Sequence, residues 1–106
     1  MDTLSQLSQL IRARKKADPK QSYTAQLLQG SRGRATRKFG EEAVELMVAS
    51  MEGSKEDIAE EAADVIYHLM VLMAHHDMSW ESVCEVLEKR QHLSGLEEKA
   101  AREIKK

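Results

Sequence analysis

Four carboxylates occur as two pairs with helical spacing. Glu42 and Glu45 lie three residues apart, and Glu61 and Asp64 repeat that spacing further along the chain. Residues three apart share a helix face, so two facing helices would bring all four carboxylates into one small volume. Carboxylates that close raise one another's pKa and need a cation among them. Mg²⁺ prefers such oxygen ligands, and Mn²⁺ can take its place. Either ion, held by carboxylates, suits phosphate chemistry.

A basic stretch precedes the first acidic pair. Its charged members in the segment GSRGRATRKFG are Arg32, Arg34, Arg37 and Lys38. One interpretation is a solvated basic face in which Lys38 pairs with Glu42 one turn on. The other is an anion-binding mouth, where a loop with glycines leads several guanidinium groups to phosphates. The spacing differs from a Walker loop, so no classical nucleotide fold is implied.

Three further side chains, Tyr23, His68 and Cys84, are of types that can take part in binding or chemistry. Tyr23 either stacks on a base or packs. His68, one turn beyond Asp64, either orients a ligand or a phosphate or is a partly buried structural residue. Cys84 has an apolar helical setting without an activating base, which predicts an inert thiol.

The composition predicts the fold class. The chain has 106 residues, a net charge of −2, 42% hydrophobic and 32% charged residues, which fits one soluble domain over residues 1–106. Strong helix formers dominate and aromatic residues are only 4%, so the expected class is all-α. Small helical chains often complete their core and pocket by dimerising. We therefore expect a helical bundle built around antiparallel helices and completed by dimerisation, as a homodimer or a higher homo-oligomer.

Apolar residues recur at helical spacing along most of the chain. Serine N-caps and glycine stops mark the boundaries, as at Gly53 and Ser54. The residue before Pro19 is pushed out of the α conformation, so the first helix ends ahead of it. The expected helices cover about residues 2–16, 23–29, 34–52 and 55–76, with a loop at 31–33, a further helix after Ser79 and a last one after a capping box at 94–97.

The helix expected at 55–76 lies at the centre of the molecule. One apolar stripe runs from Ile58 to His76, and another runs from Ala59 through Ala63 to Met73, which predicts two packed neighbours. An antiparallel hairpin with the preceding helix would set the two acidic pairs opposite each other.

The charge and the apolar runs of the sequence indicate the cellular compartment of the protein and the kinds of partner it can bind. Near-neutral charge argues against a protein that coats nucleic acid. No apolar leader is visible, and the most apolar run, residues 65–74, is too short to span a membrane. The single cysteine excludes an internal disulfide and suits a reducing compartment. We expect a cytoplasmic protein without nucleic-acid or membrane partners.

Four segments carry a resemblance to a known family: SYT at 22–24, KFGEEA at 38–43, EAADVIYHL at 61–69 and SGLEEK at 94–99. The chain resembles the phosphoribosyl-ATP pyrophosphohydrolases, within the MazG-like all-α nucleoside triphosphate pyrophosphatase superfamily. The paired acidic motif belongs to the whole superfamily, whereas the other segments are narrower. Phe39 stands where small aliphatic residues are more usual, which affects no catalytic residue.

The resemblance implies Mg²⁺-dependent hydrolysis of phosphoribosyl-ATP to phosphoribosyl-AMP and pyrophosphate, the second step of histidine biosynthesis. Glu41 would hold a second metal or orient the attacking water. The implied metal ligands are Glu42, Glu45, Glu61 and Asp64. The implied catalytic residues are Lys38, Glu41 and Glu42. The implied substrate-binding residues are Tyr23, Arg32, Arg34, Arg37 and Lys38.

Two alternatives stand beside this hypothesis. The same mechanism would serve a house-cleaning pyrophosphatase that acts on non-standard nucleotides or deoxynucleotides. A non-catalytic helical module would instead use the acidic face and the basic arms to hold a protein or RNA. Members of the resembled family are often fused to the cyclohydrolase of the next pathway step. The sequence shows no such domain, so we expect a separate cyclohydrolase enzyme as the pathway partner.

Overall fold

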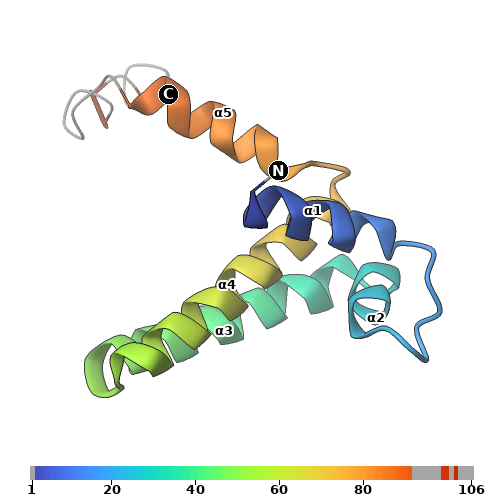
Figure 1. Ribbon diagram of the computed structural model, residues 1–106, viewed down its shortest axis with the longest axis horizontal. Coiled ribbons are helices and arrows are strands. Elements are labelled where there is room, and N and C mark those ends of the chain that lie inside the picture. Colours follow the sequence, from blue (N-terminus) through green and yellow to red (C-terminus); the bar gives the residue numbers. More distant parts are fainter. Residues whose placement is uncertain (1, 92–98, 101, 103–106) are drawn as a thin grey trace.

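The computed structural model describes residues 2–91, 99, 100 and 102, and within them it is helical without any strand. The helices are α1 (Thr3–Ala13), α2 (Tyr23–Gln29), α3 (Arg32–Glu52), α4 (Lys55–His75) and α5 (Trp80–Arg90). Figure 1 shows α3 and α4, the two longest described helices, side by side as a hairpin. The all-α class and the antiparallel helices expected from the sequence are confirmed.

A tight turn joins α3 to α4. Ser54 caps α4: its hydroxyl accepts a hydrogen bond from the backbone N–H of Asp57 at 3.1 Å. The Asp57 carboxylate accepts one from the N–H of Ser54 at 3.2 Å, which completes a capping box. A Cβ added at Gly53 would lie 2.9 Å from the carbonyl oxygen of Ala49. The turn therefore needs glycine, and it directs α4 back along α3.

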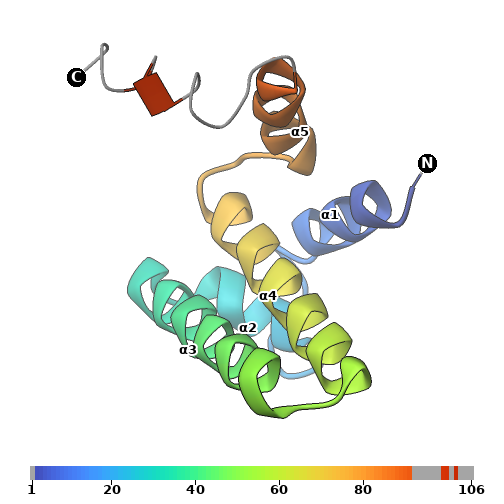
Figure 2. The ribbon, with the colours of Figure 1, turned by 90° about the vertical axis from the view of Figure 1, so that its left-hand side faces the viewer.

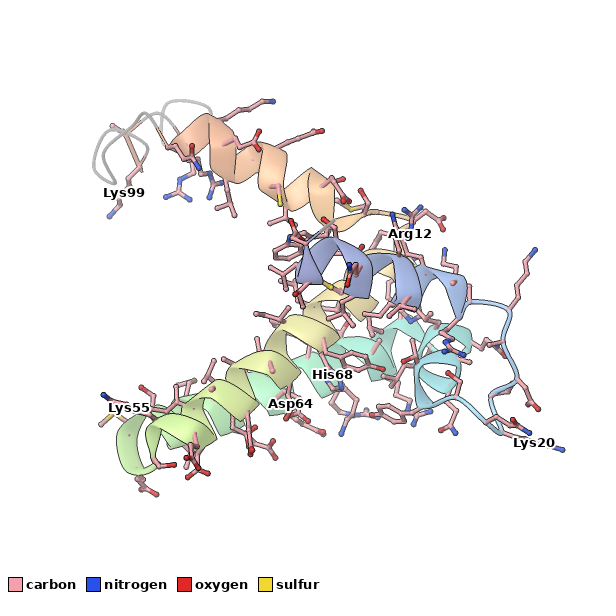
Figure 3. All side chains as sticks on the ribbon, in the orientation of Figure 1. Arg12, Lys20, Lys55, Asp64, His68 and Lys99 are labelled. Carbon is pink, nitrogen blue, oxygen red and sulfur yellow. The ribbon has the colours of Figure 1, made fainter. Side chains whose placement is uncertain are left out.

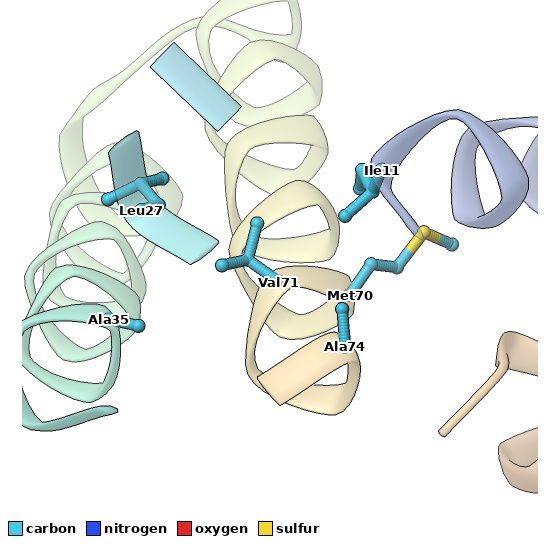
Figure 4. Packing of buried hydrophobic residues seen from close by; sticks show 6 residues of the cluster. All are labelled: Ile11, Leu27, Ala35, Met70, Val71 and Ala74. Atoms are coloured by element: carbon cyan, nitrogen blue, oxygen red, sulfur yellow. The ribbon is translucent and has the colours of Figure 1, made fainter. Parts of the chain in front are cut away.

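The core lies around the second half of α4. Figure 4 shows Leu27 and Val71 between α2 and α4, and Ile11 and Met70 between α1 and α4. His75 adds a polar link, because its Nε2 donates to the carbonyl oxygen of Leu27 at 2.9 Å. In Figure 2, α1 and α2 both lie against α4 towards the end where α5 begins. The turn end of the hairpin, around Gly53 and Ser54, has no covering helix within the described residues (Figure 2).

Several boundaries differ from the sequence expectation. The first helix ends at Ala13 rather than at residue 16, and α4 ends at His75. The expected loop at 31–33 is wrong: Ser31 is the N-cap, and its hydroxyl accepts from the N–H of Arg34 at 3.0 Å, so α3 begins at Arg32. The side-chain cap expected at Ser79 is also absent, although α5 starts directly after it. The expected capping box at 94–97 lies outside the described residues.

The second stripe of α4 is buried only in part. Met70 and Met73 are buried, as predicted, but Ala59 and Ala63 are exposed because no element of the described chain covers that end of the helix. His76 lies just past the helix and is exposed. None of the helices in the described part of the chain combines the length and the apolar character needed to cross a membrane.

Candidate metal centre

Three carboxylates from two helices meet on the α3–α4 hairpin. Glu42 and Glu45 come from α3 and Glu61 from α4, and one oxygen of each lies within 4.8 Å of the others. Glu42 and Glu61 are half-buried, whereas Glu45 is exposed. The hairpin thus brings together three of the four carboxylates that were expected to converge.

Two oxygens of this group are buried without a hydrogen-bond partner among the described residues. They are Oε2 of Glu42 and Oε2 of Glu61. Buried polar atoms in folded proteins are nearly always paired, so an orphaned carboxylate oxygen indicates a missing donor or cation. Clustered carboxylate oxygens are the ligands that Mg²⁺ and Mn²⁺ prefer. The donor set therefore fits a divalent cation.

The electrostatics of the cluster agree with this fit. Burial raises the pKa of Glu42, and the hydrogen bond with Glu45 and the negative charges of Glu45 and Asp64 raise it further. Burial also raises the pKa of Glu61, followed by the charges of Glu45 and Asp64. Each ionised carboxylate thus opposes ionisation of its neighbours. A cation at their centre would reverse the sign of that interaction.

Asp64 lies beside the cluster without joining it in this conformation. Its side chain is exposed, and its oxygens are not among those gathered within 4.8 Å. Its charge nevertheless acts on Glu42 and Glu61, as their raised pKa values show. Figure 3 shows Asp64 on α4, one turn before His68. Its role as a metal ligand stays a prediction.

Lys38 does not make the ion pair that its spacing suggested. Its Nζ lies 3.2 Å from Oε2 of Glu41, three residues on, rather than on Glu42. This hydrogen bond is the main cause that raises the pKa of Lys38, and the second is the nearby phenol of Tyr23. Tyr23 is 46% exposed, so it does not pack in the core. The structure thus places Tyr23, Lys38 and Glu41 near one another where α2 meets α3.

The three arginines of the basic stretch are exposed on the first turns of α3. A helix turns about 100° per residue, so Arg34 and Lys38 share the side that carries Glu42 and Glu45. By the same geometry Arg32 lies on the opposite side and Arg37 at the margin. Arg34 is therefore better placed than Arg32 to act with the carboxylates.

One contact near the site was missed by sequence reasoning. The hydroxyls of Thr24 and Tyr67 are hydrogen-bonded, which links α2 to α4. Burial is the main cause that raises the pKa of Tyr67. The only signal in the sequence was that Thr24 belongs to the SYT segment and Tyr67 to the EAADVIYHL segment of the resemblance. The bond fixes α2, and with it Tyr23, relative to the carboxylates.

The fold and the site together define a class. An all-α chain in which two long antiparallel helices gather carboxylates is the arrangement that the resemblance implied. The family model described as phosphoribosyl-ATP pyrophosphohydrolase matches residues 4–91. The chain belongs to the phosphoribosyl-ATP pyrophosphohydrolase family.

Curated relatives agree over nearly the whole chain. The phosphoribosyl-ATP pyrophosphatase of Methylobacterium nodulans is 45% identical over 100 residues, which cover 94% of each chain. That of Dinoroseobacter shibae is 44% identical over 102 residues, 96% of this chain and 100% of its own. That of Rhizobium johnstonii is 43% identical over 101 residues, 95% of this chain and 94% of its own.

Proposed function

We propose that this chain hydrolyses phosphoribosyl-ATP to phosphoribosyl-AMP and pyrophosphate, using Mg²⁺ held by the carboxylates of α3 and α4. Family membership supports the reaction, which is a step of histidine biosynthesis. The observation that carries the metal requirement is the group of three carboxylates within 4.8 Å, two of which have a buried, unpartnered oxygen. The non-catalytic helical module considered from the sequence does not fit a member of a hydrolase family.

Glu42, Glu45 and Glu61 would hold the ion, and Asp64 is the proposed fourth ligand. Asp64 is exposed, so its side chain is free to rotate towards the cluster. A bound Mg²⁺ would polarise phosphate oxygens and acidify a coordinated water. The carboxylates would thereby fix where the polyphosphate and the attacking water meet.

The reaction balances without a further reactant. The oxygen of water forms a bond to the α-phosphorus while the bond from that phosphorus to the bridging oxygen breaks. The electron pair leaves with pyrophosphate, and the protons of water pass to solvent and products. The chain must therefore stabilise negative charge on the leaving group and hold a water on the opposite side of the phosphorus.

Cationic groups on α3 would bind the outer phosphates. Lys38 and Arg34 lie on the same side of the helix as Glu42, with Lys38 one turn away from it. Their charges would offset the charge that develops on pyrophosphate. Glu41 holds Lys38 at 3.2 Å and would orient it, while the exposed Tyr23 beside Lys38 offers a ring for the base.

We also propose that two copies associate through α3. An exposed apolar stripe runs along this helix. Its members are Val44, Met47, Val48 and Met51, which are 57%, 66%, 52% and 84% exposed. The spacing i, i+3, i+4, i+7 is that of a helix that packs against a partner on this side as well. The stripe continues into an open groove of about 530 Å³ that reaches Glu45 and Glu61. A second copy on this surface would cover the exposed side of the carboxylate site.

The cytoplasm is the compartment we propose for this reaction. The half-buried thiol of Cys84 has no partner cysteine in the sequence, which suits a reducing environment.

A pyrophosphate-release assay on phosphoribosyl-ATP tests the proposal. Turnover should require Mg²⁺ and disappear with a chelator, and Mn²⁺ should substitute. A panel of standard and non-standard nucleoside triphosphates, measured in parallel, separates the house-cleaning alternative. Faster turnover of any of these triphosphates than of phosphoribosyl-ATP would overturn the proposed substrate.

A further inference from the structure

His68 is a buried histidine on the same side of α4 as the carboxylate cluster. Its residue exposure is 6%. Glu61, Asp64 and His68 follow one another at spacings of three and four residues, so they share one face of the helix. Helical side chains lean towards the N-terminus, which brings the imidazole back over the turn that carries Asp64. Figure 3 shows the two residues in this order along α4.

One ring nitrogen of His68 has a defined partner. Nδ1 lies 2.9 Å from the backbone carbonyl oxygen of Asp64. A carbonyl oxygen only accepts, so Nδ1 must carry the hydrogen of this bond. In the neutral imidazole the other nitrogen, Nε2, then bears a lone pair and is an acceptor. The helix itself therefore selects the tautomer.

The second ring nitrogen has no partner. Nε2 of His68 is buried and makes no hydrogen bond with any described residue. The two orphaned oxygens of Glu42 and Glu61 are also acceptors when ionised. The imidazole lies close enough to Glu42 for its positive form to lower the pKa of that carboxyl. Three acceptors near one another, none of them with a donor, indicate that a donor belongs between them.

A cation among the carboxylates does not account for Nε2, because His68 is not among the ligand groups gathered within 4.8 Å of one another and Mg²⁺ prefers oxygen to nitrogen ligands. A water molecule does, because it can face a cation with its oxygen and donate a hydrogen bond to a neighbouring nitrogen. A phosphate oxygen would not serve, because it is an acceptor like Nε2. In the neutral ring, the unpartnered nitrogen therefore selects water over phosphate as its ligand.

We propose that Nε2 of His68 accepts a hydrogen bond from a water held beside Glu42 and thereby orients this water for attack on the α-phosphorus. This assignment rests on the proposed function, since it names the residue that positions the nucleophile of that reaction. It also replaces the two earlier interpretations of His68, as a phosphate contact or as a purely structural residue. The Nδ1 bond to Asp64 is what holds the ring in place.

Two substitutions separate the two nitrogens. In His68→Asn the amide nitrogen takes the place of Nδ1 and retains the bond to the Asp64 carbonyl, but nothing remains at the Nε2 position. In His68→Gln the amide reaches the Nε2 position, where its oxygen can accept from water. We expect kcat to fall about 10- to 100-fold in His68→Asn. KM and the Mg²⁺ concentration that gives half-maximal activity should stay within about twofold of the values for the unsubstituted chain. His68→Gln should recover part of that loss.

Activity alone would not distinguish this role from a structural one, so a spectroscopic measurement accompanies it. Nitrogen-15 NMR of the histidine-labelled chain reports which ring nitrogen carries hydrogen. We expect a protonated Nδ1 and an unprotonated Nε2 for His68, and an upfield shift of the Nε2 resonance when Mg²⁺ alone is added. Hydrogen on Nε2 in the neutral ring, or full kcat in a folded His68→Asn, would overturn the assignment.

Failure of the proposed function has a different signature. An unsubstituted chain that releases no pyrophosphate from phosphoribosyl-ATP would refute that activity. The tautomer and its response to Mg²⁺ are measured without substrate, so they still decide whether Nε2 accepts a hydrogen bond. The inference fails by itself when the unsubstituted chain is active and His68→Asn is equally active.

Discussion

Glu42 on α3 and Glu61 on α4 each hold one carboxylate oxygen that is buried and unpartnered, and both belong to a group whose oxygens lie within 4.8 Å of one another. Two such groups repel when ionised, and nothing in the described chain neutralises them from within the group. The hairpin that brings them together is fixed elsewhere, by the Gly53–Ser54 turn and by the core around Val71. The site is therefore held against its own repulsion by the rest of the fold.

Mg²⁺ should stabilise the folded chain. A ligand that binds only the folded state adds about 2.7 kcal/mol at a concentration 100 times its Kd. For a domain of this size that corresponds to a rise in Tm of roughly 10 °C or more. Thermal melts with and without Mg²⁺ measure it. Equal Tm values at millimolar Mg²⁺ would contradict the metal site.

Glu42→Gln should have opposite effects on stability and on activity. Removing the charge relieves repulsion from Glu45 and Asp64, so the metal-free variant should melt at a higher temperature at neutral pH. Loss of a ligand should lower turnover by more than about 100-fold. Glu85→Gln, on the exposed middle of α5, is the matched control and should change neither quantity. A Glu42→Gln variant with normal turnover would exclude this carboxylate from the metal centre.

In the metal-free protein, Glu42 and Glu61 should contribute a component of stability that is lost as the pH rises through the acidic range. The pKa values of Glu42 and Glu61 are raised above their ordinary value of 4.5, so the folded chain keeps these protons when the unfolded chain has lost them. The resulting stabilisation is present below pH 4.5 and is lost as the pH passes through the raised values. Denaturant unfolding at several pH values in a chelator checks this. The double variant Glu42→Gln, Glu61→Gln should lose this component of the pH dependence, and an unchanged profile would count against it.

Met47→Glu should disrupt association of two copies. Met47 lies in the exposed apolar stripe of α3, and a charge there would be desolvated in an interface. We expect sedimentation to show a dimer for the unsubstituted chain and a monomer for the variant. Leu10→Glu on α1 is the control, since Leu10 is 57% exposed on a different helix. If Leu10→Glu dissociates the dimer and Met47→Glu does not, the interface lies on α1 and the proposed interface on α3 is wrong.

Leu27→Ala should weaken both the fold and the site. Leu27 is 1% exposed and packs in the core between α2 and α4. Truncation of such a residue costs about 2–5 kcal/mol. KM should also rise, because α2 carries Tyr23 next to Lys38. Leu10→Ala, at an exposed position, should stay within about 0.5 kcal/mol of the unsubstituted chain. Denaturant unfolding gives the two changes in stability, and the pyrophosphate-release assay gives KM.

Local sequence signals determined the helices and the pairing of the acidic residues. Spacing placed Glu42 with Glu45, and glycine and serine at 53 and 54 marked the turn, because capping and periodicity act over a few residues. The start at Arg32 was missed because Gly33 favours a loop, although the Ser31 hydroxyl caps the helix through a local bond from the N–H of Arg34.

The tertiary structure decided what no local pattern encodes. The rotation of α3 against α4 gathered Glu42, Glu45 and Glu61 and left Asp64 beside them, because helix packing sets which side chains converge. It also buried Nε2 of His68 without a partner and joined Thr24 to Tyr67. Spacing along the chain fixes the faces of single helices. Only the packing of those faces fixes distances between residues far apart in sequence.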